Sequence, residues 1–142
     1  MSMVMKEERR FGFTKEERVK GRKRVETLFA DGASFLVYPF KVIYVEKDRQ
    51  GKAPFSILIS VPKKRLKSAV LRNRVKRMTR EAYRLQKNLL ECSSFPENRQ
   101  CDVAFVYVKD RLCDYPTVEK AMRKSMEMLN RKVIRKEVCG KC

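Results

Sequence analysis

The sequence predicts an α+β fold, with a small central β-sheet flanked by helices, and three observations lead to this prediction. Segments of helical spacing and segments of two-residue apolar alternation follow one another in the order helix, strands, helix, strand, helix. The chain has 142 residues, which suits one domain, and 43% of them are hydrophobic, which is enough for a core. No internal repeat or low-complexity segment interrupts this order. An α/β sandwich with the same element order is the alternative.

The domain is expected to span residues 14–133. Residues 1–13 lack sustained periodicity and are expected to form a flexible basic arm, and residues 134–142 are expected to form a flexible tail. The letters "TKEE" at Thr14–Glu17 match a capping box, so a helical turn is expected to begin there.

A first helix is predicted in the segment "RVKGRKRVETLFADG". Val25, Leu28 and Phe29 lie on one helical face, and Gly32 is placed to end the helix. Gly21 disfavours one continuous helix that would begin at Thr14, because a glycine inside a helix lowers the stability of that helix.

Three strands are expected next. Phe40–Glu46 and Pro54–Val61 alternate between two faces, as strands do. The charged segment around Gly51 suggests that a hairpin connects these two strands. A shorter strand is expected at Phe35–Tyr38, ended by Pro39.

The last part of the chain predicts a central strand and a closing helix. Cys101–Lys109 is apolar on both faces, which indicates a strand in the middle of a sheet. The segment after it has helical spacing, and Asp114 or Thr117 is placed to cap that helix. Its apolar positions are Val118, Met122, Met126, Leu129 and Val133.

Between the predicted strands Pro54–Val61 and Cys101–Lys109, the segment Leu71–Leu89 combines a narrow apolar stripe with a basic arc. The predicted core-facing stripe steps alternately by four and three residues. It comprises Leu71, Val75, Met78, Ala82, Leu85 and Leu89. The opposite arc holds Arg72, Asn73, Lys76, Arg77, Arg80, Arg84 and Lys87, with Tyr83 among them and with Arg74 and Glu81 near one border.

This basic arc predicts a polyanionic partner. The whole chain carries a formal net charge of +18, which repels itself and costs stability. A merely solvated helix would mix both signs of charge, yet cations stand four residues apart at Arg72, Lys76 and Arg80. Arginine forks suit phosphate groups. A membrane surface fits less well because the apolar stripe is narrow, and no helix-turn-helix spacing indicates a DNA-binding regulator.

The composition offers little for catalysis by the chain itself. It has no histidine for general acid–base chemistry and no tight carboxylate cluster for a two-metal nuclease. Asp102 and Asp110 bracket one strand, where a capping or loop role is expected for each. Cys139 and Cys142 form a single terminal C-x-x-C, which fits free thiols on a tail better than a metal or redox site. The five irregularly spaced cysteines and the lack of a long apolar run predict a soluble, cytoplasmic protein.

The stretch "SVPKKRLKSAVLRNRVKRMTREAYR" resembles the signature of the bacterial ribonuclease P protein component. The match centres on "RNR" at Arg72–Arg74, followed by "VKR" and "REAYR", and preceded by "SVPKK". "LFADG" is similar to the end of the family's opening helix, and the resemblance covers roughly Arg18 to Leu129. Val25 stands where the family often has an aromatic residue, and Gly21 stands where a basic residue is common.

The resemblance implies a fold and a function. The fold would be ribosomal protein S5 domain 2-like, with a left-handed βαβ crossover that runs through the basic helix. The chain would be one subunit of a ribonucleoprotein that removes the 5′ leader from precursor tRNA, in the cytoplasm and without membrane or DNA partners. The catalytic RNA subunit would hold the Mg²⁺ ions, and this chain would contribute no catalytic or metal-binding residue. A structural RNA-binding protein, such as a ribosomal protein, is the alternative that composition alone allows.

The resemblance and the basic arc together assign two groups of binding residues. Contacts with the RNA subunit are expected at Lys63, Lys64, Arg72, Asn73, Arg74, Lys76, Arg77 and Arg80. Contacts with the single-stranded leader are expected at Arg18, Lys20, Phe29 and Tyr44, where the two aromatic rings would offer stacking platforms. Phe29 as a core residue, and Asn73 as an ordinary polar surface residue, are the alternatives.

Overall fold

The computed structural model describes residues 18–19, 21–48, 54–90 and 95–134. The capping box at Thr14–Glu17, the arm at 1–13, Lys20 and the tail beyond Ile134 lie outside the described residues. The described helices and strands confirm the α+β class and run in the predicted order. They are α2 (Arg22–Asp31), β1 (Ala33–Val37), β2 (Phe40–Asp48), β3 (Phe55–Ser60), α3 (Ala69–Gln86), η2 (Lys87–Leu89), β4 (Arg99–Tyr107), α4 (Tyr115–Leu129) and η4 (Asn130–Ile134).

The four strands form one mixed sheet in the order β1-β2-β4-β3. β4 pairs antiparallel with β2 and parallel with β3, which confirms its predicted central place. The predicted hairpin between β2 and β3 is wrong, because β4 lies between them and its apolar faces are covered on both sides. Strand alternation alone could not distinguish a hairpin neighbour from a strand one position further away.

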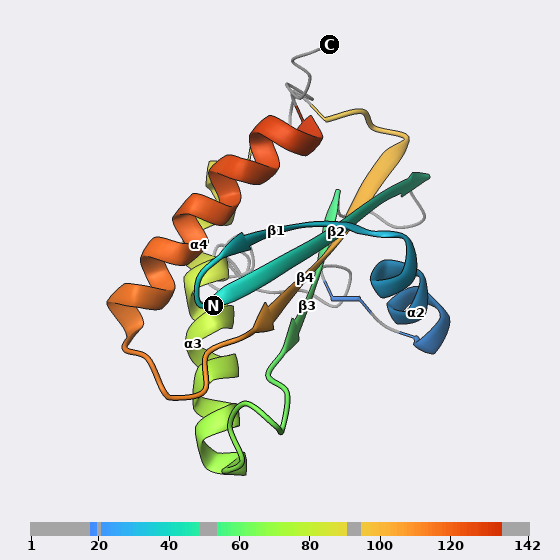
Figure 1. The fold of residues 1–142 in the computed structure, drawn as a ribbon. Coiled ribbons are helices and arrows are strands. Elements are labelled where there is room, and N and C mark those ends of the chain that lie inside the picture. The colour runs from blue at the N-terminus through green and yellow to red at the C-terminus, as the bar shows by residue number, and fades with distance from the viewer. Residues whose placement is uncertain (1–17, 20, 49–53, 91–94, 135–142) are drawn as a thin grey trace, which may run out of the picture.

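Helices cover both faces of the sheet (Figure 1). The larger core lies between the sheet and the pair α3 and α4, and it includes Phe40, Phe105 and Met122. The smaller core lies under α2 and joins Leu28 to Ile43 and Ala104. β2, β3 and β4 therefore contribute alternate residues to two separate apolar layers.

The β3–α3–β4 crossover is left-handed, as the resemblance implies. The side chain of Ile57 belongs to the core under α3, whereas its carbonyl accepts a hydrogen bond from the Val19 amide (3.1 Å), away from β4. On the other edge of β3, the Pro54 carbonyl accepts from the Cys101 amide (2.8 Å). For L-residues, these directions place β4 to the left of β3 when the parallel strands point up and α3 is in front. About 98% of such connections have the opposite hand.

The buried face of α3 differs from the predicted stripe at its C-terminal end. Leu85 and Leu89 are 49% and 44% exposed, whereas Thr79, Tyr83 and Gln86 are buried. α3 packs against α4 as well as against the sheet, so its buried face turns toward α4. Two polar side chains of this face donate hydrogen bonds to backbone carbonyls. The Thr79 hydroxyl donates to the Val75 carbonyl (2.7 Å), and Gln86 Nε2 donates to the Glu119 carbonyl (3.1 Å).

Helix ends coincide with the predicted capping residues Asp114 and Gly32, and Ser68 caps α3 in addition. The Ser68 side chain accepts from the Leu71 amide at the start of α3, and the Asp114 side chain accepts from the Thr117 amide at the start of α4. Gly32 ends α2, but its backbone is extended with φ −75°, so no left-handed conformation requires glycine. A Cβ there would stand 2.5 Å from the Leu28 carbonyl and 2.7 Å from Ile43 Cγ2, so close packing explains the glycine.

None of the described helices combines the length and the apolar character that crossing a bilayer requires. Two of the cysteines, Cys101 and Cys113, are buried free thiols, and burial raises the pKa of the Cys101 thiol. The terminal C-x-x-C at Cys139 and Cys142 lies outside the described residues.

Candidate nucleic-acid interface

The surface of α3 that points away from both cores is basic. We define the basic face of α3 by the predicted residues that the helix presents away from the sheet. These are Asn73, Arg74, Lys76, Arg77 and Arg80, of which Lys76 is half-buried and the others are exposed. Lys63 and Lys64 are exposed in the loop that leads into the helix. All eight residues predicted to contact the RNA subunit therefore lie on α3 or in its entry loop.

The eighth residue, Arg72, has a different environment. Its Nη1 atom donates to the backbone carbonyls of Leu66 and Lys67, each at 2.9 Å. The Leu66 side chain is buried, so this guanidinium fastens the entry loop to the first turn of α3. Arg72 thus stabilises the platform from which the basic face projects, and its contact with RNA stays a prediction.

The basic face has little countercharge. Glu81 pairs with Arg84 at 2.6 Å, and the hydrogen bond from Arg84 lowers the pKa of the Glu81 carboxyl. Within the described part of the chain, Arg74, Arg77 and Arg80 take part in no ion pair. Unneutralised guanidinium groups on one helix are suited to a chain of phosphates.

A hollow of about 340 Å³ lies beside the outer edge of β3. It joins two residues that the sequence assigned to different partners, Arg80 of the basic face and Arg18 before α2. The remaining lining residues are Val19, Ile57, Leu58 and Ile59. At this edge the segment before α2 forms one backbone bridge with β3, between Arg18 and Ile57. The lining of this hollow thus includes one basic residue from each of the two predicted groups.

The two predicted aromatic platforms lie on opposite faces of the sheet. Phe29 is on α2 and is 45% exposed, so the alternative that it is a core residue is not supported. Tyr44 packs on the other face, with its ring 5.9 Å from that of Phe35, and burial raises the pKa of its hydroxyl. The cause is the two-residue period of β2, which directs Ile43 and Val45 toward α2 instead. No groove between Phe29 and Tyr44 is formed.

Sequence reasoning missed the polar cluster around Asp102. The prediction of a capping or loop role for this residue is wrong, because it lies inside β4 with a side chain only 1% exposed. Its contacts join β4 to α2 and β2. The available signal was one acidic residue inside the apolar run "CDVAFVYV", which a buried strand tolerates only with partners. In the described residues, no group of three or more His, Cys, Asp or Glu side chains could hold a metal ion.

Comparison with known sequences identifies one family. The family model described as Ribonuclease P matches residues 13–130 of this chain. The ribonuclease P protein component of Porphyromonas gingivalis is 46% identical over 116 residues, which cover 82% of this chain and 85% of that protein. The protein of the same name from Chlorobaculum tepidum is 31% identical over 133 residues, which cover 89% of this chain and 86% of that protein.

Solved structures show the same fold. The RNase P protein of Staphylococcus aureus superimposes with a TM-score of 0.61 at 23% identity, over 83% of this chain and 97% of that chain. The RNase P protein of Thermotoga maritima gives a TM-score of 0.58 at 25% identity, over 81% of this chain and 96% of that chain.

Proposed function

Because the chain belongs to the family of ribonuclease P protein components, we propose that it binds the catalytic RNA subunit through the basic face of α3 and the 5′ leader of precursor tRNA on its α2 side. The protein is part of an endoribonuclease complex that acts in tRNA processing. Its role in that complex is to bind and orient RNA, and the hydrolytic step belongs to Mg²⁺ ions held by the RNA subunit.

The observation that carries this proposal is the row of unneutralised arginines on a rigid helix. Arg74, Arg77 and Arg80 are exposed, stand at three-residue intervals and have no ion-pair partner among the described residues. Each phosphate that such a side chain neutralises releases counterions, so binding is strong at low salt and falls steeply as salt is added. A folded RNA offers many phosphates to one such surface.

We place the leader contact on the other side of the sheet edge. Phe29 offers an exposed ring for base stacking, and Arg18 lines the hollow that leads toward α3. Lys20 is included by sequence, although it lies outside the described residues. Tyr44 packs on the opposite face of the sheet, against the core that α3 and α4 cover, so we do not include it in this surface.

The first prediction tests the basic face. Arg74→Ala combined with Arg77→Ala should weaken binding to the RNA subunit and reduce the magnitude of the log–log salt slope by about 1.4–1.8, since two phosphate contacts are lost. The measurement is affinity for the cognate RNA subunit across a KCl series. Arg123→Ala combined with Lys124→Ala is the matched control, because it removes the same charge from exposed positions of α4.

If both double variants change the salt slope equally, only net charge matters for binding, and the proposed interface would be abandoned.

The same protein preparations also test where catalysis resides. Site-specific, Mg²⁺-dependent cleavage of precursor tRNA by wild-type protein free of RNA would contradict the assignment of chemistry to the RNA subunit.

A further inference from the structure

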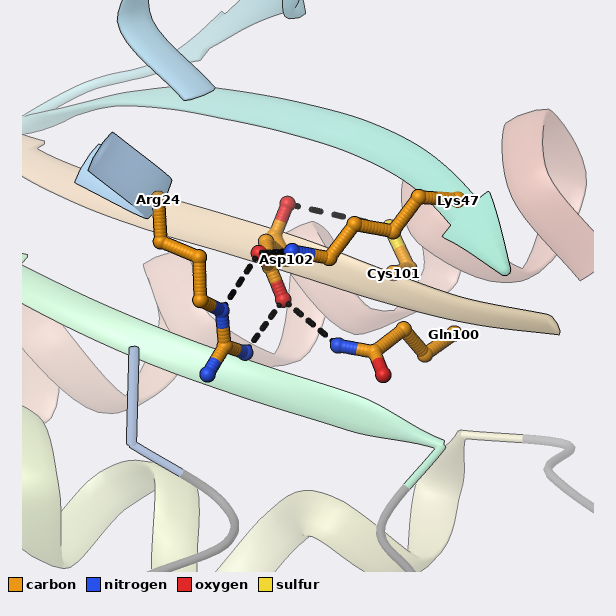
Figure 2. A network of polar contacts seen from close by, with 5 residues as sticks. All are labelled: Arg24, Lys47, Gln100, Cys101 and Asp102. Carbon is orange, nitrogen blue, oxygen red and sulfur yellow. Dashed lines mark hydrogen bonds and ion pairs between the residues drawn. The ribbon is translucent and has the colours of Figure 1, made fainter. Parts of the chain in front are cut away.

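Asp102 is a buried carboxylate that joins three elements of the fold (Figure 2). From α2, Arg24 donates from Nε to Oδ2 at 3.1 Å and from Nη2 to Oδ1 at 2.8 Å. From β2, Lys47 Nζ lies 3.1 Å from Oδ2. Gln100, two residues away on β4, donates from Nε2 to Oδ1 at 3.1 Å. Both carboxylate oxygens are thus held from two directions.

A buried charge of this kind is an expensive way to hold a helix. Burial alone would raise the pKa of Asp102, but the hydrogen bonds and charges of Arg24 and Lys47 outweigh it and leave the pKa below its usual value. Apolar side chains of similar volume often give equal stability in place of a buried ion pair. The bidentate Arg24–Asp102 contact also fixes the relative orientation of the two side chains, because a planar guanidinium group binds a carboxylate through two hydrogen bonds in very few orientations.

α2 needs this external support because its own sequence stabilises it poorly. It has 10 residues, which is too short to be stable alone, and it begins at Gly21 without a side-chain cap. Arg22, Lys23 and Arg24 all stand in its first turn, where the helix dipole disfavours positive charge. Only Leu28 is fully buried. Asp102 supplies the negative charge that this helix start lacks.

The attachment fixes α2 at two points. Arg24 ties its first half to β4 and β2, and the close approach at Gly32 sets its end against β2. Phe29 lies between these two points, on the solvent side. Arg24 and Phe29 are about 7.5 Å apart along the helix axis at 1.5 Å per residue. Loosening the first point would therefore change where Phe29 stands relative to the sheet.

We propose that Asp102 is a positioning residue for precursor recognition: through Arg24 it sets the place of α2, and so of the leader surface that α2 carries. The inference rests on the proposed function, because it concerns the same leader surface. It assigns no contact between Asp102 and RNA. Its effect reaches the substrate through α2, and the basic face of α3 on the opposite face of the sheet is not involved.

The test uses holoenzyme reconstituted with Asp102→Asn, with Arg24→Gln and with both substitutions. The affinity gained per added leader nucleotide is measured with precursors of increasing leader length. Each variant should lose about 3- to 30-fold of the total leader-dependent gain in affinity, which lies within the range for groups coupled in one network. The double variant should lose no more than the more affected single variant. KM should rise for leader-bearing precursor, while kcat at saturation and affinity for the RNA subunit stay unchanged.

The control is Asp48→Asn, which removes an exposed ion pair with Arg99 between β2 and β4 without touching α2. The Asp48→Asn holoenzyme should keep the wild-type gain in affinity per added leader nucleotide. If Asp102→Asn does not fold, Arg24→Gln carries the test, because the Arg24 side chain is 27% exposed and its loss leaves the Lys47 contact in place. Arg24→Lys keeps the positive charge but lacks the guanidinium group that makes two hydrogen bonds, so it should restore only part of the leader-dependent gain in affinity.

Three results would overturn the inference. One is a wild-type leader gain in both single variants. Another is an equal loss of affinity for the leader and for the RNA subunit, since that indicates general destabilisation. The third is a double variant with additive losses, because the two residues would then act separately. If the wild-type holoenzyme itself gains nothing from a leader, the proposed leader surface fails, and the inference fails with it.

Discussion

Arg72 shows that residues with the same charge can have different roles within one motif. It stands one residue before Asn73 in the family signature, yet its guanidinium holds backbone carbonyls of the entry loop, whereas Arg74 and Arg77 are exposed. Removing it leaves two carbonyls without their charged donor. A loss of affinity in an Arg72 variant therefore has two sources, which stability measurements can separate.

The second prediction follows from this difference. Arg72→Ala should lower the free energy of unfolding by about 1–3 kcal/mol, as expected for hydrogen bonds to a charged group that is partly exposed. Arg77→Ala should change it by no more than about 0.5 kcal/mol, because its side chain is exposed and unpaired in the described structure. Urea denaturation of the protein without RNA measures both. Equal stability of the two variants would mean that the loop contacts of Arg72 contribute nothing.

The third prediction concerns Asp102 and pH. Its folded pKa lies below the unfolded value of about 3.9, so its contribution is complete above that value and is lost as the pH falls toward the folded pKa. Asp102→Asn should cost about 2–3 kcal/mol at pH 7, which is less than for a fully buried pair because Arg24 and Lys47 are partly exposed. The difference from wild type should shrink as the pH falls from about 5 to 2. Urea midpoints across this range measure it, and a difference that does not shrink at all over this range would show that the carboxylate charge is not responsible.

At the scale of elements, α3 shows what an apolar pattern can and cannot predict. Its existence and its basic face follow from spacing and residue type. Its buried face does not, because Thr79, Tyr83 and Gln86 are covered by α4, a contact between segments far apart in the sequence. A sequence read one helix at a time assigns polar residues to solvent, and tertiary packing can reverse this.

The fourth prediction tests this corrected face. Leu85→Gln should change the free energy of unfolding by no more than about 0.5 kcal/mol, because the Leu85 side chain is half exposed. Val75→Ala, at a position with no exposure, should cost on the order of 2 kcal/mol. Thermal and urea unfolding of the two variants give the comparison. A larger loss of unfolding free energy in the Leu85 variant than in the Val75 variant would support the apolar stripe predicted from the sequence.

The strands and the site show the same limit of prediction. The class of fold, the central place of β4 and the exposed arginines of α3 were predictable, because each follows from composition and local period. The insertion of β4 between β2 and β3 depends on pairing between distant strands. The face on which Tyr44 lies depends on which helices cover each face of the sheet. The hand of the crossover came only from the family resemblance, since general rules favour the other hand. The role of Asp102 required the position of α2.

At the scale of the whole molecule, the net charge of +18 affects folding and binding in opposite directions. The fifth prediction is that raising KCl from 50 to about 500 mM will increase the thermal midpoint of the free protein, because salt screens self-repulsion. The same change should weaken binding to the RNA subunit. Thermal denaturation and affinity measurements in the same buffers test this. A midpoint that falls with added salt would show that favourable ion pairs, such as those of Asp102 and Arg99, outweigh the repulsion.

The strand order also has a consequence for synthesis on the ribosome. β4 is the partner of both β2 and β3, yet residues 61–98 separate it from β3 in the chain. Until β4 has left the exit tunnel, the nascent chain exposes the unpaired edges of two apolar strands, beside a cationic helix that has no sheet to pack on. Unpaired edges favour aggregation and capture by chaperones. Emergence of the segment up to Tyr107 from the exit tunnel therefore ends the interval in which this protein is most vulnerable to misassembly.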